Sequence, residues 1–135
     1  MGNDENGIES LAMKGALNLN DLQEMLGTTS ASVVTAEDWG ITYNSGTGQL
    51  SEYCTLVANN PGNPITGVGM LAYSADGSTL YCLQYSNGFN SPLINTSIGT
   101  TLYNPQDGNQ ALCVVYGWTE QASFYMTKTL TIGNE

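Results

Sequence analysis

From about residue 30 to its end, the chain consists of short runs of Val, Ile, Thr and Tyr separated by Gly, Asn, Pro and Asp. Runs of this kind indicate strands, and their regular spacing is typical of sandwiches and barrels. The pattern predicts a mainly β fold, an immunoglobulin-like or fibronectin-like antiparallel β-sandwich of about seven strands. The predicted strands are 32–43, 49–58, 65–75, 78–85, 93–103, 110–118 and 123–132.

The segments between these runs predict two kinds of connection. Asp76-Gly77 and Asn87-Gly88 favour tight hairpins, because Asn, Asp and Gly adopt positive φ at low cost. The longer, proline-containing segments 60–64 and 104–109 predict loops that cross from one sheet to the other.

The last predicted strand has the clearest period of two. Phe124, Met126, Leu130 and Ile132 share one face, and Tyr and Thr residues share the other. Lys128 interrupts the apolar face, which favours an edge strand where a lysine blocks unwanted pairing.

Residues 1–29 differ from the β-rich remainder and predict a separate helical segment before a sandwich domain at 30–135. Apolar residues recur there at helical spacing, and Asn20 with Gln23 resembles a capping box. Such a short helical segment is expected to pack on the sandwich or on a neighbouring subunit. The residues predicted to carry self-association are Leu11, Leu22, Met25 and Leu26.

The charge balance excludes one class of partner. Only 10% of residues are charged, the net charge is -10, and Lys and Arg together number two. Binding to nucleic acid depends on cations that neutralise phosphates, so nucleic acid is excluded as a partner. Electrostatic docking on anionic lipid is disfavoured for the same reason, whereas insertion of apolar side chains stays open.

The sequence leaves the compartment unknown. The N-terminus lacks the basic flank and apolar stretch of a signal peptide, and no apolar run approaches the roughly 20 residues that span a bilayer. The composition is compatible with an extracellular or surface-assembled protein.

The residue types present argue against catalysis. The chain has no His, so neither a Ser-His-Asp nor a Cys-His arrangement can form. The carboxylates of the β region read as turn and surface residues, and no calcium-loop or CxxC zinc motif occurs. We therefore expect no catalytic residue, no metal site and no cofactor.

The three cysteines allow at most one internal disulfide. All lie in apolar strand contexts. Cys54 and Cys113 are the candidate inter-sheet disulfide pair, which leaves Cys82 over. The alternative is that all three are buried free thiols, which pack like small apolar side chains.

Aromatic residues are the candidate ligand contacts, because Tyr and Trp combine an apolar face with a polar group. On one predicted strand, Tyr81 and Tyr85 share a face with Leu83. The candidate ligand-binding residues are Trp39, Tyr81, Tyr85, Phe89, Trp118 and Tyr125.

The leading functional prediction is a non-enzymatic, self-associating β-sandwich, a subunit of a homo-oligomer, filament or other assembly. Faces rich in Tyr, Thr and Asn lose little side-chain entropy when they pack. The first alternative is a lectin-like module that binds a glycan or a cell-surface protein, and the second is a membrane-active toxin whose N-terminal helices insert.

Overall fold

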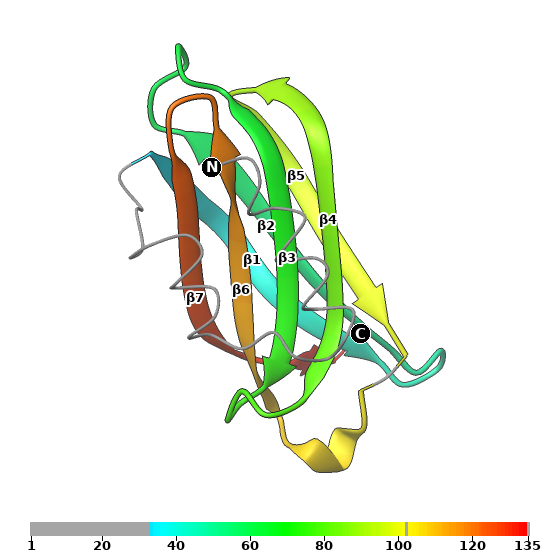
Figure 1. Ribbon diagram of the computed structural model, residues 1–135. Helices are drawn as coiled ribbons and strands as arrows, with labels where there is room; N and C mark the ends of the chain where they lie inside the picture. The colour runs from blue at the N-terminus through cyan, green and yellow to red at the C-terminus, as the bar shows by residue number, and fades with distance from the viewer. Residues whose placement is uncertain (1–32, 102, 135) are drawn as a thin grey trace.

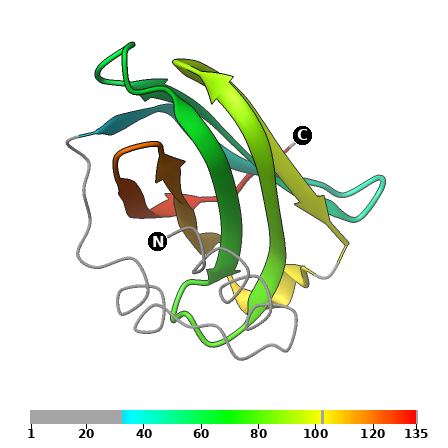
Figure 2. The same ribbon diagram turned by 45° about the horizontal axis from the view of Figure 1, so that its top comes forward.

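The computed structural model describes residues 33–101 and 103–134, which form two four-stranded sheets packed face to face (Figures 1 and 2). The strands are β1 (Val34–Asn44), β2 (Gln49–Ala58), β3 (Ile65–Ser74), β4 (Leu80–Ser91), β5 (Leu93–Thr100), β6 (Gln110–Thr119), β7 (Ser123–Thr131) and β8 (Gly133–Asn134), with a 3-10 turn η1 (Pro105–Asp107) between β5 and β6.

One sheet has the order β5-β2-β1-β8 and the other the order β4-β3-β6-β7. All pairings are antiparallel except the short β1–β8 pair. The sheet that contains β1, β2 and β5 packs against the sheet that contains β3, β6 and β7, as in immunoglobulin domains. The fourth strand joins β3, whereas in immunoglobulin constant domains it joins the other sheet. The predicted sandwich and its seven main strands are confirmed.

Alternation along the strands builds the core between the sheets. β2 directs Leu50, Glu52, Cys54 and Leu56 inward, and all four are buried. Figure 2 shows how strongly both sheets twist around this interior.

The predicted connections are correct with one exception. Asp76-Gly77 forms the β3–β4 turn, where Gly77 has φ 77° and its N–H donates to the Ser74 carbonyl at 2.8 Å. Segments 60–64 and 104–109 do cross between the sheets.

The exception is Asn87-Gly88, which lies inside β4 instead of forming a hairpin turn. The pairing of β3 with β4 shifts register at this end, and Gly88 has φ 85°. The positive φ that the sequence predicts is therefore present, but it is used in a β-bulge that bends a long strand.

The predicted faces of the last strand are confirmed. Phe124 is buried in the core between the sheets, and Met126 and Leu130 pack against that core. Tyr125 points to the opposite face, and Lys128 is exposed on β7, which is an outer strand of its sheet.

The helical segment predicted at 1–29, with Leu11, Leu22, Met25 and Leu26, lies outside the described residues. The boundary between this segment and the sandwich therefore stays a prediction.

Candidate functional site

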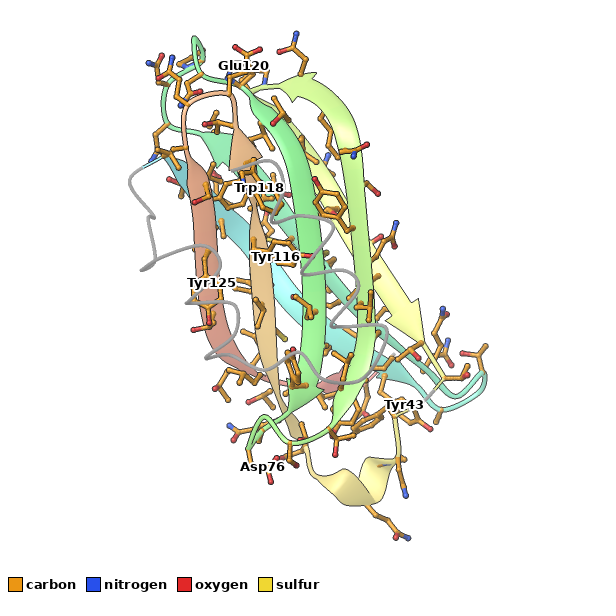
Figure 3. All side chains as sticks on the ribbon, viewed as in Figure 1. Tyr43, Asp76, Tyr116, Trp118, Glu120 and Tyr125 are labelled. Carbon is orange, nitrogen blue, oxygen red and sulfur yellow. The ribbon has the colours of Figure 1, made fainter. Side chains whose placement is uncertain are left out.

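A second apolar cluster covers the face of the β4-β3-β6-β7 sheet that points away from the core (Figure 3). It arises because β3 and β6 carry apolar residues at both alternating sets of positions, which is typical of a sheet buried on both sides. We call this surface the aromatic face. Its members are the buried Leu71, Tyr73, Val114, Tyr116, Trp118 and Tyr125 and the half-buried Leu80, Leu83, Tyr85 and Leu112.

Three rings at the centre of the aromatic face pack against one another. Tyr85 and Tyr116 are stacked, with centroids 6.1 Å apart and planes within 8°. Trp118 meets both edge-on, at 5.8 Å from Tyr85 and 5.9 Å from Tyr116. These are the preferred geometries for aromatic pairs, so the three side chains form one ordered unit.

A glycine on β3 makes this ring arrangement possible. Gly69 pairs with Tyr85 on one side and with Tyr116 on the other. The Tyr116 ring occupies the place where a Cβ on Gly69 would lie. The two tyrosines therefore meet above a bare stretch of backbone, as rings do when they cover a glycine in a sheet.

The chemistry of the aromatic face is that of a contact surface. None of its ten side chains carries a charge at neutral pH, and burial raises the pKa of Tyr125 further. None of the described strands, nor η1, lies on this face (Figure 1). The six buried members are at most 6% exposed, so the accessible part of this face is limited to its half-buried members.

The outer face of the other sheet is different. Thr55, Asn95 and Ser97 lie on it, and the Thr55 hydroxyl donates to Asn95 Oδ1 at 2.8 Å. The large apolar side chains exposed on it do not form a cluster: Tyr53 is 44% exposed and Leu93 is 51% exposed. The sandwich thus has one apolar outer face and one polar outer face.

A buried carboxyl and an indole form a second unusual arrangement. Glu52 lies on the inner face of β2 and is 0% exposed. Its Oε2 accepts a hydrogen bond from Trp39 Nε1 at 2.7 Å, whereas Oε1 has no partner among the described residues. Desolvation raises the pKa of Glu52 from 4.5 to about 8, opposed by the hydrogen bond from Trp39. At neutral pH the carboxyl is therefore mainly protonated.

A bulge in β1 brings Trp39 to this carboxyl. Glu37 pairs with Thr55 and Gly40 with Tyr53, so Asp38 and Trp39 together oppose a single residue of β2. Asp38 has φ 49°, a conformation that only Asn, Asp and Gly adopt readily. The extra residue changes the side to which Trp39 points.

The three cysteines are buried and carry free thiols, so the candidate Cys54–Cys113 disulfide is not formed in the structure. Cys54 comes from one sheet and Cys113 from the other, as predicted, but both pack within the core as small apolar side chains. Burial, and then the charge of Glu52, raise the pKa of Cys54 and of Cys82 to about 12, and the pKa of Cys113 is raised for the same reasons.

We expect none of the three thiols to react with a thiol-specific reagent at pH 8 while the protein is folded, because a buried neutral thiol is a poor nucleophile. After unfolding in denaturant without reductant, all three should react. Mass spectrometry counts the labels directly. A single label after unfolding would show that a disulfide forms after all.

The six candidate ligand-binding residues do not form one site. Tyr85, Trp118 and Tyr125 meet on the aromatic face. Tyr81 does not join them, because β4 shifts register between Leu80 and Cys82 and turns Tyr81 into the core. There its ring meets Tyr103 edge-on at 5.3 Å.

The other two candidates lie elsewhere. Phe89 packs against the core cluster from the far end of β4, and Trp39 lies at the middle of β1. Sequence reasoning did not select Tyr116 or Glu52. Two signals in the sequence were available. For Tyr116 it was the Gly67-Val68-Gly69 run on the neighbouring strand, and for Glu52 it was the position of a carboxylate between Leu50 and Cys54.

No protein family and no curated protein matches the sequence. Solved structures do resemble the sandwich. OgpA from Akkermansia muciniphila has a TM-score of 0.50 at 8% identity, covering 78% of this chain and 28% of that one. A β-glucuronidase from Parabacteroides merdae has a TM-score of 0.52 at 12% identity, covering 73% of this chain and 13% of that one. A DUF3823 family protein from Bacteroides ovatus has a TM-score of 0.50 at 9% identity, covering 75% of this chain and 55% of that one.

The chain thus spans less than two thirds of each of these proteins, and identities this low show a shared fold alone. Among the described residues, no helix has the length and hydropathy that crossing a membrane requires. Nor do those residues bring together three His, Cys, Asp or Glu side chains that could hold a metal ion.

Proposed function

We propose that the protein is a non-enzymatic subunit that works by self-association, with the aromatic face as its association surface. The observation that supports this most is the apolar outer side of the β4-β3-β6-β7 sheet, which no described strand covers. Its composition is that of a sheet side that another apolar surface buries.

The N-terminal segment is the part of the sequence that could pack on the aromatic face of a neighbouring copy. Leu11, Leu22, Met25 and Leu26 recur at helical spacing, and the acidic residues of the segment would stay in water. We expect a neighbouring copy to contribute this segment as a helix of at least two turns, which would lie along β3 and β6. The net charge of -10 opposes encounter at long range, so apolar contact must supply the affinity.

Light scattering coupled to size-exclusion chromatography tests this proposal at micromolar concentration. The full chain should have a mass that is a multiple of 14.3 kDa. Tyr85→Glu places a charge at a half-buried position of the aromatic face and should weaken association at least tenfold, because an unpaired carboxylate would be desolvated. Leu22→Glu should have the same effect from the other side of the interface.

The matched control is Thr55→Glu, which adds the same charge to the polar outer face of the other sheet and should leave the mass unchanged. A single-chain mass for the unmodified protein across the micromolar range would contradict the proposal. Equal effects of Tyr85→Glu and Thr55→Glu would show that net charge, and not the aromatic face, controls assembly.

A further inference from the structure

A groove lies at the open edge of the sandwich, where β1 of one sheet faces β7 of the other. β1 pairs with β8 only at Thr42 and Tyr43, and β7 pairs only with β6. Along the groove, therefore, each strand has a described neighbour on one side only, β2 beside β1 and β6 beside β7. The lining includes apolar side chains from both strands and the indole of Trp39.

Three unfavourable features converge on the position of this one indole. Asp38, the residue before it, has a left-handed backbone at φ 49°. The β1 ladder is interrupted at the same place by the bulge. The hydrogen-bond acceptor of Trp39 is a fully buried carboxyl whose second oxygen is unpartnered among the described residues. Each feature costs stability, and such costs gather where a side chain must be held for binding.

A purely structural role would not require this arrangement. An apolar residue in place of Glu52 would suit the inner face of β2, where Leu50 and Cys54 flank it. An unbroken strand would keep the ladder intact. What the bulge and the carboxyl achieve together is a fixed orientation of the Trp39 ring, and a rigid aromatic ring binds with little loss of entropy.

The rest of the groove defines the chemistry of the ligand. The half-buried Ala36 and Met126 supply apolar surface beside the Trp39 ring, which suits a flat, partly apolar molecule. Asp38 contributes a hydrogen-bond acceptor and Lys128 contributes donors, so the two charges offset each other. A protein of net charge -10 disfavours an anionic ligand. A neutral sugar ring, apolar on its faces and rich in hydroxyls at its edge, meets all three conditions.

We propose that this groove binds a neutral oligosaccharide, with one sugar ring stacked on Trp39. Glu52 is a positioning residue, which acts through the indole and does not touch the sugar. This binding site is separate from the aromatic face, so it does not depend on whether the protein self-associates.

Isothermal titration tests the proposal with four soluble neutral probes, the linear hexasaccharides of glucose, xylose, mannose and N-acetylglucosamine. At least one should bind saturably, and Trp39→Ala should weaken that binding at least tenfold. Asp38→Gly, which suits a positive φ, should weaken it severalfold by removing the acceptor. The matched control is Tyr85→Ala, which removes a half-buried ring from the aromatic face on β4 and should leave the affinity unchanged.

The role of Glu52 has its own readout. Glu52→Gln keeps an acceptor for the indole and should bind like the unmodified protein, whereas Glu52→Leu should bind severalfold more weakly with the same near-ultraviolet circular dichroism outside the tryptophan bands. Absence of binding by all four hexasaccharides at millimolar concentration would overturn the proposal. So would binding that survives both Trp39→Ala and Asp38→Gly in folded protein.

Discussion

Replacing Glu52 with Gln is expected to raise the free energy of unfolding at pH 9 by several kcal/mol and to change it little at pH 4. The cause is the burial of this carboxyl between the sheets, which raises its pKa from 4.5 to about 8. In the unfolded chain the same carboxyl is solvated and ionises near its ordinary value. Folding therefore favours the protonated form.

The sign of the pH dependence follows from proton counts. Between about pH 4.5 and pH 8 the folded protein keeps a proton on Glu52 that the unfolded chain has released. Stability then falls as the pH rises through this window, and the loss is complete above the folded pKa. A change from 4.5 to about 8 corresponds to an upper limit of roughly 5 kcal/mol.

Urea unfolding from pH 4 to pH 9, at fixed protein concentration, measures this dependence. Glu52→Gln removes the ionisable group, so the downward slope of stability across this window should largely disappear. Glu37→Gln is the control, because it removes an exposed carboxyl from β1. If the unmodified protein and Glu52→Gln lose stability in parallel, the buried carboxyl does not govern the pH dependence.

The second large effect concerns the contact between Gly69 and Tyr116. Tyr116→Ala is expected to destabilise the fold by about 3 kcal/mol, because it removes a buried ring and leaves a gap above the backbone of β3. Gly69→Ala should cost about 1–3 kcal/mol, since its methyl group would meet the Tyr116 ring.

The double variant should reveal the coupling between these two residues. Once the ring is absent, the methyl group of Gly69→Ala has space, so the second substitution should cost almost nothing. The combined loss is then smaller than the sum of the single losses by about 1–3 kcal/mol. Gly133→Ala is the control, because its added methyl group would make only ordinary contacts. Strictly additive losses would mean that the ring does not depend on the bare backbone.

The sequence predicted most of the fold because the strands are regular and the turn residues mark their ends. Alternation located the inward side of β7 correctly, from Phe124 to Leu130. Where the predictions failed, the cause was irregular backbone. Gly88 forms a bulge within β4, and the register shift near Tyr81 turns that ring inward. A bulge changes which side a residue faces, and its position depends on the partner strand as well as on local sequence.

The candidate site was predictable only in part for a related reason. Tyr85, Trp118 and Tyr125 were recognised as contact residues, and the structure brings these three together. Tyr116 was not, because its importance comes from Gly69 on the neighbouring strand. Glu52 was assigned no role, since a single carboxylate in an alternating run gives no sign that its partner lies across a bulge.

The free cysteines have a consequence for where such a domain can mature. Among the described residues no sulfur–sulfur bond links the two sheets, so packing and not a covalent cross-link holds this part of the chain together. Glutathione at cytosolic levels would leave the sandwich intact, and so would an oxidising exterior, because its thiols are shielded from both.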